Sequence, residues 1–375
     1  ISYFNENVVL LPKREIVTYD YVAESKDLPY ERIEALNKIY EGKAKVIVTT
    51  IEALMQRIVP KNVLYKNLIK FNIGKTYNLE EIKKTLVSLG YIRCDLIEAK
   101  GQFSIRGGIL DIAITDKKGV RIEFWGDDVD SIRYFNIASQ RSTEMIENVT
   151  IYPCHEFVLD TNLEDVCKEI ENRYDEEKYE NIIKNDIELI KSGNYISKID
   201  KYYDSFYKNT TNLLDYIEDN YIIFLDEANK IKARANNVLV DNQNVQKMLI
   251  EKEKIIPDAI SNIYEYEDVI SQILRRQTVY LEKQDTSFVD ENIANAKRNG
   301  INFTTREVNF YKSGMELFLE EVQIAINEKK TVVVLAGNEQ NSQKLSLLLL
   351  EKEIPHKYME KLDKDIPNSV VTVST

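Results

Sequence analysis

The stretch that decides the fold reads QFSIRGGILDIAITDKKGVRIEFWGDDVDSIRYFNI and spans residues 102–137. Apolar and polar side chains alternate along it, which predicts half-buried strands, because successive side chains of a strand point to opposite faces. In the predicted strand 120–126, one face carries Val120, Ile122 and Phe124, and the other carries Arg121, Glu123 and Trp125. In the preceding segment, Phe103 and Ile105 share one face, and Gln102, Ser104 and Arg106 share the other. The stretch therefore predicts a compact sheet with one apolar and one polar face.

Glycines and turn residues divide this stretch into strands. Gly107-Gly108 predicts a sharp bend or bulge, because glycine adopts backbone angles that a Cβ forbids. The apolar face then resumes at Leu110, Ile112 and Ile114. The next four residues of interest, Asp116-Lys117-Lys118-Gly119, predict a hairpin turn with glycine in its last position.

The polar face of the predicted sheet collects residue types that are common in protein interfaces. It carries Arg106, Arg121, a carboxylate and Trp125, the only tryptophan among 375 residues. Arginine and tryptophan dominate the energetics of many interfaces, because they combine a large buried area with oriented donors or an aromatic surface. The pattern leaves an alternative open, in which Trp125 packs under a neighbouring loop and both arginines form ordinary surface ion pairs.

Several sequence words resemble the bacterial transcription-repair coupling factors (Mfd) and, more distantly, UvrB. They are FSIRGGILDI at 103–112, VRIEFWGDDVDSIRYF at 120–135, SQRS at 139–142 and VTIYPCHEF at 149–157. The similarity extends upstream through VIVTTIEALMQRIVP at 46–60 and downstream through NYIIFLDEANKI at 220–231, so it covers most of the chain. The words SQRS and EALMQR favour the coupling factors over UvrB.

This resemblance implies a function for the polar face. In the coupling factors the corresponding domain recruits UvrA, the damage sensor of nucleotide excision repair, and the contacting residues carry over by motif position onto Arg106, Arg121 and Trp125. The family's C-terminal domain is thought to mask this surface until the motor engages. The resemblance thus implies a non-catalytic adaptor that recruits UvrA to stalled RNA polymerase in transcription-coupled nucleotide excision repair. RNA polymerase, DNA, ATP and Mg²⁺ would be bound by later domains, with no cofactor in this segment.

The resemblance also implies an α/β fold built from three domains. A degenerate helicase-type (RecA-like) parallel-sheet domain would span residues 1–75 and 159–285. A small α+β domain with an antiparallel sheet, at 76–158, would be inserted into it and would bind UvrA. A linker and a small α/β domain would fill 286–375. Because the chain starts at Ile1 and stops in a strand pattern, we expect a piece of a longer protein that lacks the start of its first domain.

Periodicity elsewhere in the chain predicts the individual elements. Strands are predicted at 8–11, 45–49, 221–225, 331–335 and 370–375, and helices at 29–40, 269–274 and 345–350. The resemblance places strand 221–225 in the sheet of the first domain, and the last unit begins near Val308. Thr50 and Asn78 are predicted helix caps, and Gly90 is a predicted helix stop. The charged stretch 159–219 predicts solvated helix faces.

The composition excludes several classes of protein. With 43% hydrophobic and 30% charged residues, the chain is predicted to be globular and not disordered. The net charge of −12 argues against broad, non-specific binding to DNA, which a basic face usually supports. Three cysteines do not form a disulfide framework, and the sequence contains no apolar run of membrane-spanning length. A reducing cytoplasm is the predicted location.

The remaining candidate chemistry is an acidic pair after a strand. Asp226-Glu227 has the form of a Walker B site, but the phosphate-binding word GxxxxGK[ST] does not occur in this sequence. We therefore interpret the pair as a vestigial Walker B-like relic or as a helix cap. His155 and His356 lack the spaced ligand sets of a zinc site, so no metal is predicted.

Two rival interpretations make different structural predictions. A UvrB-type ATP-dependent helicase subunit predicts a Walker A lysine upstream of Ile1 and an aromatic hairpin near residues 50–63. A generic scaffold without a UvrA contact predicts that Trp125 is buried.

Overall fold

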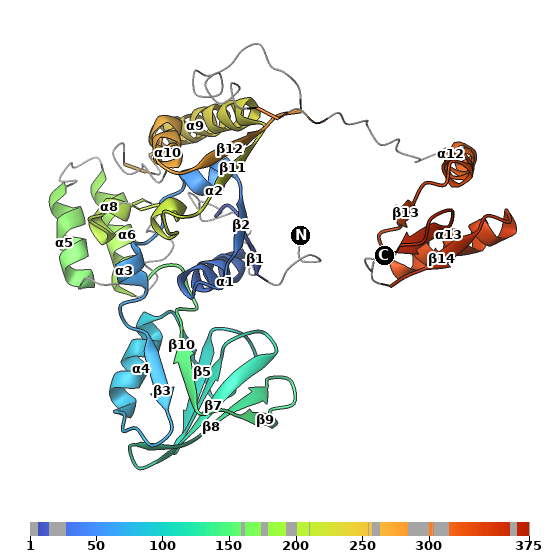
Figure 1. The fold of residues 1–375 in the computed structure, drawn as a ribbon. Coiled ribbons are helices and arrows are strands. Elements are labelled where there is room, and N and C mark those ends of the chain that lie inside the picture. Colours follow the sequence, from blue (N-terminus) through green and yellow to red (C-terminus); the bar gives the residue numbers. More distant parts are fainter. Residues whose placement is uncertain are drawn as a thin grey trace. The chain divides into compact units, whose positions relative to one another are not determined.

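The computed structural model forms two compact units, Ile1–Arg298 and Asn299–Thr375, which are described separately (Figure 1). It describes residues 7–14, 28–158, 162–173, 179–192, 201–209, 211–253, 255–256, 263–283, 300–301, 303, 315–360 and 366–374. The mixed α/β class is confirmed, and most strand pairs of the largest sheet are antiparallel. Among the described helices, none is both long enough and apolar enough to cross a membrane.

A β-α-β motif opens the first unit. Strand β1 (Val8–Leu11) pairs in parallel with β2 (Val46–Thr49), and helix α1 (Leu28–Tyr40) connects them. The helix buries Ile33, Leu36 and Ile39 because they recur at helical spacing. The predicted cap is confirmed, since Thr50 accepts a hydrogen bond from the Ala53 amide at the start of α2 (Ile51–Met55). Helix α3 (Lys61–Leu64) follows.

A second part of the chain packs into the same hydrophobic cluster. Its helices are α5 (Leu163–Arg173), α6 (Glu180–Lys191), α8 (Tyr203–Phe206), α9 (Ala228–Glu251) and α10 (Tyr266–Ile273), with the 3₁₀ turn η2 (Leu213–Asp215). Strand β11 (Ile223–Asp226) pairs in parallel with β12 (Thr278–Leu281). The single sheet that was expected to contain this strand and the first strands is not confirmed in the described residues. There β1–β2 and β11–β12 form two separate two-stranded sheets.

The predicted sheet at residues 102–137 is the centre of a six-stranded sheet. Its order is β4 (Ile92–Arg93), β5 (Gln102–Arg106), β6 (Ile109–Ala113), β7 (Lys118–Trp125), β8 (Asp128–Asn136) and β9 (Ser142–Met145). Only β4–β5 is parallel. Beside it, β3 (Ile69–Asn72) pairs antiparallel with β10 (Asn148–Ile151).

The apolar face of this sheet packs against helix α4 (Leu79–Ser88) and the β3–β10 pair. Ile82 and Leu86 of the helix, and Leu89 directly after it, join the apolar side chains of the strands in one buried cluster. The predicted ends of α4 are confirmed, since Asn78 Oδ1 accepts hydrogen bonds from two backbone amides and Gly90 has a φ of 91°. The opposite face is therefore left for polar residues.

The turn between β6 and β7 corrects a prediction. Gly119 is not the last residue of a turn, because β7 begins at Lys118, and Ile114 and Thr115 both donate backbone hydrogen bonds to the Lys118 carbonyl. Gly119 instead lies in the strand opposite Ala113 and Phe135. A Cβ at this position would overlap the Phe135 ring, so the glycine serves packing.

Replacing Gly119 with alanine is expected to lower the free energy of unfolding by about 1–3 kcal/mol, because the added methyl group overpacks the site. Urea unfolding followed by circular dichroism measures the change. The double variant Gly119→Ala with Phe135→Leu should recover part of the loss, because the smaller side chain makes room. Absence of any recovery would place the strain elsewhere.

A buried ion pair joins helix α1 to the segment that follows β10. Arg32 on α1 donates from Nε and Nη2 to the two carboxylate oxygens of Glu156, each at 2.8 Å. Both side chains are almost fully buried. Asn37 adds a hydrogen bond to the Pro153 carbonyl at 3.1 Å. The segment after β10 is thus fixed to α1.

Two groups in this junction make stability depend on pH. Burial lowers the pKa of His155. Burial alone would raise the pKa of Glu156, but the Arg32 guanidinium lowers it below its ordinary value. As the pH falls below about 6.5, the unfolded chain binds a proton at His155 that the folded chain excludes. The free energy of unfolding therefore decreases until the pH reaches the lower pKa of the folded state. Below about pH 4.5, protonation of Glu156 in the unfolded state removes more stability.

We expect His155→Asn to flatten the pH dependence of unfolding as the pH falls below about 6.5. A single histidine contributes up to about 1.4 kcal/mol per pH unit in such a window. Asparagine keeps an acceptor for the Phe157 amide, which now donates to His155 Nδ1 at 3.1 Å. Urea titrations at several pH values test this, with His356→Asn as the control that retains the slope. An unchanged slope in His155→Asn would contradict the assignment.

The second unit is a small α/β layer structure. It contains α12 (Met315–Asn327), β13 (Val332–Leu335), α13 (Glu339–Glu351), β14 (His356–Tyr358) and β15 (Val371–Ser374). The strands are parallel in the order β13-β15-β14 and share a cluster with both helices. Strands β13 and β15 were predicted and β14 was not, whereas Val308 lies outside the described residues.

Candidate partner-binding surface

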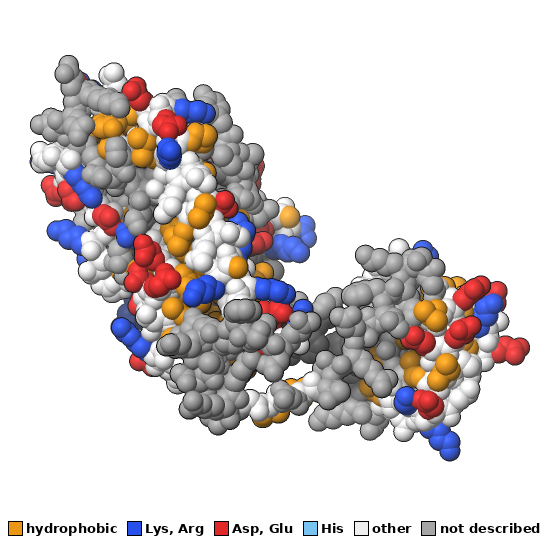
Figure 2. Space-filling view, turned by 90° about the horizontal axis from the view of Figure 1, so that it is seen from above, with side chains coloured by type: hydrophobic (Ala, Val, Ile, Leu, Met, Phe, Trp, Pro, Cys, Tyr) orange, Lys and Arg blue, Asp and Glu red, His pale blue; other side chains and the backbone are white. Residues whose placement is uncertain are grey.

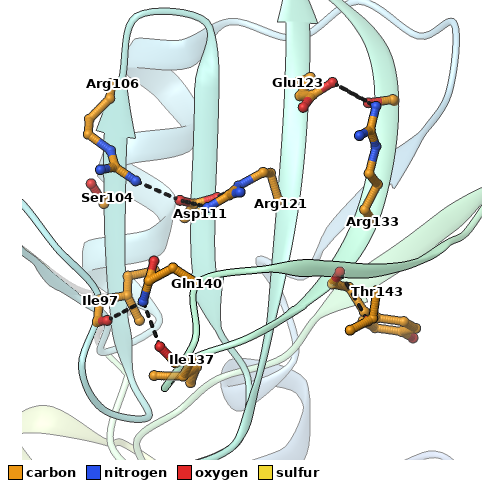
Figure 3. A network of polar contacts seen from close by, with 12 residues as sticks. Ile97, Ser104, Arg106, Asp111, Arg121, Glu123, Arg133, Ile137, Gln140 and Thr143 are labelled. Carbon is orange, nitrogen blue, oxygen red and sulfur yellow. Dashed lines mark hydrogen bonds and ion pairs between the residues drawn. The ribbon is translucent and has the colours of Figure 1, made fainter.

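The polar face of the six-stranded sheet carries a row of charged residues that the strand register aligns. Asp111 on β6 is paired with Arg121 on β7, which is paired with Arg133 on β8. In the adjacent row, Ile109 is paired with Glu123. Figure 3 shows Asp111, Arg121 and Arg133 on neighbouring strands. We call Arg106, Asp111, Arg121, Glu123 and Arg133 the charge ladder.

Asp111 is the centre of the charge ladder. It accepts hydrogen bonds from Arg121 Nε at 2.8 Å and Nη2 at 3.0 Å, and from Arg106 Nη2 at 3.1 Å (Figure 3). The residue is 1% exposed, so its charge is buried beneath the two guanidinium groups. The hydrogen bonds to Asp111 raise the pKa of Arg121. Both arginines are therefore held in place before any partner arrives.

A second ion pair continues the ladder toward β8. Glu123 Oε2 accepts hydrogen bonds from Ser131 Oγ at 2.7 Å and from Arg133 Nη2 at 3.2 Å. Both charged side chains are about one-third exposed. Such a pair contributes little to stability, because solvent screens it.

Trp125 ends the β7 strand at the tip of the β7–β8 hairpin. Its side chain is 85% exposed, and Asp128 lies opposite it. The alternatives in which Trp125 is buried or packs under a loop are wrong in this structure. The expected ion pairs of the two arginines are present, and they converge on one carboxylate. A large exposed aromatic side chain on the same strand as a fixed guanidinium group is a composition found at interface hot spots.

The far end of the same face is closed by a small apolar cluster. Ile97, Ala113, Phe135 and Ile137 form it. Gln140 fixes the covering loops, because its Nε2 donates to the carbonyls of Ile97 at 2.9 Å and Ile137 at 2.7 Å (Figure 3). This apolar cluster thus lies at the end of the face away from Trp125.

The acidic pair Asp226-Glu227 lies where β11 ends and α9 begins, and the Glu227 side chain does not form the hydrogen bond expected of a helix cap. Asp226 is the last residue of the strand, and Glu227 has a φ of 58° at the start of α9. The Glu227 side chain pairs with Lys230 and does not cap the helix. Glu282 accepts a hydrogen bond from the Ala228 amide at 3.0 Å instead. Glu227 thus occupies the N-cap position of α9 without a capping hydrogen bond from its side chain, and Glu282, which follows β12, accepts a hydrogen bond from the helix instead.

Among the described residues, no group of three or more His, Cys, Asp or Glu side chains is placed to hold a metal ion. Figure 2 shows one face of the molecule, where the coloured Lys and Arg side chains alternate with Asp and Glu. The described part of that face therefore presents no continuous basic area.

Comparison with known proteins bears directly on this sheet. Residues 69–157 match the family model of the UvrB interaction domain. The chain is 27% identical over 363 residues to the transcription-repair-coupling factor of Bacillus subtilis, and 25% identical over 381 residues to that of Staphylococcus epidermidis. The resemblance to the transcription-repair coupling factors is confirmed. These alignments cover 93% and 99% of this chain but only 30% and 32% of the two coupling factors.

Within the UvrB interaction domain match, the sequence prediction missed the residues that hold the site together. The sequence analysis did not single out Asp111, although an acidic residue between the apolar Leu110 and Ile112 indicates a carboxylate on the polar face of the strand. Strand parity puts it on the face of Arg121. The sequence contains no pattern that predicts the role of Gln140, because its side chain bonds the backbone of Ile97, which is brought near only by the fold.

Proposed function

We propose that this chain is a non-catalytic, UvrB-like adaptor that recruits UvrA to stalled RNA polymerase in transcription-coupled nucleotide excision repair. The observation that carries the proposal is the 85% exposed Trp125 at the end of β7, the strand that also carries Arg121, within the residues that match the UvrB interaction domain. Trp125, Arg106 and Arg121 would contact UvrA. A solvated indole side chain contributes to binding when a partner covers it, because its apolar area then leaves water.

The proposed domain organisation extends this assignment. A degenerate helicase-type sheet domain would comprise residues 1–75 and 159–285, and the UvrA-binding domain would comprise 76–158. The parallel pairs β1–β2 and β11–β12, which share one hydrophobic cluster, support the first part. The boundary of the compact units after Arg298 lies within the proposed linker and third domain at 286–375. Further domains of a full-length protein would bind RNA polymerase, DNA, ATP and Mg²⁺, and its C-terminal domain would mask the UvrA surface.

Two observations favour the adaptor over a UvrB-type helicase subunit. Residues 50–63 contain α2, single bridging pairs at Gln56 and Ile58, and the start of α3, in place of the aromatic hairpin that the helicase predicts. The Glu227 carboxylate, which would polarise the attacking water in a working site, is paired with Lys230.

Binding of purified UvrA to this chain tests the proposal. Isothermal titration should show a saturable complex at physiological salt. Absence of binding by the folded wild-type chain would overturn the adaptor assignment.

A further inference from the structure

The two arginines of the charge ladder differ in how much of each guanidinium group is already used. Arg121 donates to Asp111 from both Nε and Nη2, its side chain is 18% exposed, and its guanidinium lies 5.0 Å from the Phe135 ring centroid. Arg106 donates to Asp111 from Nη2, and its side chain is 52% exposed. Arg121 is thus laid against the sheet, whereas Arg106 presents most of its donors to solvent.

From this difference we infer that Asp111 is a positioning residue that orients Arg106 toward a carboxylate of UvrA and uses Arg121 as a fixed support. The inference rests on the proposed function of this face. Two guanidinium groups share one buried carboxylate, so the group keeps one net positive charge. A carboxylate is the expected partner group, because it is attracted to this positive charge and accepts a charge-assisted hydrogen bond from the exposed guanidinium of Arg106.

Lysine substitutions separate the two roles. Lysine keeps the charge but cannot donate two parallel hydrogen bonds from a planar group. We expect Arg121→Lys to weaken UvrA binding at least tenfold, because the bidentate contact with Asp111 is lost. Arg106→Lys should weaken binding by less than about fivefold, because a single ammonium still meets the partner carboxylate.

Asp111→Asn tests the positioning role directly. Asparagine has nearly the same shape but lacks the charge that holds both guanidinium groups, so we expect at least a tenfold loss of affinity. The matched control is Asp186→Asn, which neutralises another buried carboxylate in α6 that accepts from Lys201 at 2.9 Å and Tyr202 at 2.8 Å. This control should bind UvrA like the wild type.

A double-mutant cycle distinguishes positioning from general support of the fold. If Asp111 acts through Arg106, Asp111→Asn should cost clearly less affinity when Arg106 is already alanine. Calorimetry with folded variants of the 375-residue chain gives the four dissociation constants. Circular dichroism establishes folding beforehand, and the two lysine variants decide the question if Asp111→Asn does not fold.

Several outcomes would overturn the inference. Wild-type affinity in Asp111→Asn, equal costs in both Arg106 backgrounds, or equal tolerance of lysine at both arginine positions would each exclude the positioning role. These results leave the adaptor function intact, because the wild-type chain still binds. No binding by the wild type would remove the proposed function and the inference together.

Discussion

Trp125→Ala is expected to weaken UvrA binding by about thirtyfold or more, which corresponds to about 2 kcal/mol. The effect should be large because the indole ring is 85% exposed in the free chain and would lose its hydration when the partner covers it. The same exposure means that the substitution removes few internal contacts, so stability should change by less than about 0.5 kcal/mol. Titration calorimetry and urea unfolding of the same preparations measure both quantities.

The matched control for Trp125 is Val87→Ala. Val87 is 56% exposed on α4, the helix that covers the opposite face of the sheet. Its removal should leave UvrA binding unchanged. If Trp125→Ala binds as tightly as the wild type, or if Val87→Ala loses as much, the interface lies elsewhere on the chain.

Glu156→Ala is expected to lower the free energy of unfolding by about 3–5 kcal/mol. Its removal leaves the Arg32 guanidinium buried without the carboxylate that accepts two of its hydrogen bonds. The charge would then face a low-dielectric environment, and its desolvation would be only partly compensated by the Pro12 carbonyl. Urea unfolding at pH 7 measures the loss.

An exposed ion pair on the same helix provides the comparison. Lys38 and Glu34 on α1 are 2.9 Å apart, and each side chain is nearly half exposed. Lys38→Ala should therefore change stability by less than about 1 kcal/mol. The double variant Arg32→Met with Glu156→Leu should recover much of the loss of Glu156→Ala, because an apolar pair leaves no unpaired charge. A loss below about 1 kcal/mol in Glu156→Ala would show that water reaches the Arg32 site.

Local rules predicted what lies close together in the sequence. Alternation along β7 separated Arg121 and Trp125 from the core residues Ile122 and Phe124. The caps at Thr50 and Asn78 depend on side chains that reach amides two or three residues away. These features depend only on residues that are neighbours in the sequence, so they could be predicted without knowledge of the tertiary structure.

Features that depend on distant partners were missed or misplaced. Arg32 meets Glu156 across 124 residues, and β11 pairs with β12 after a long helix. Gly119 was taken for a turn residue because the Phe135 ring that excludes a side chain there belongs to the next strand. Asp111 was overlooked for a related reason, since its role depends on two arginines from neighbouring strands.

The position of Trp125 also determines what the fluorescence of this chain can report. It is the only indole in the sequence and is already surrounded by water in the folded state. Its emission should therefore shift little when the chain unfolds and shift toward the blue when a partner covers the hairpin tip. The chain thus carries an intrinsic optical probe that responds to docking and is nearly silent to denaturation.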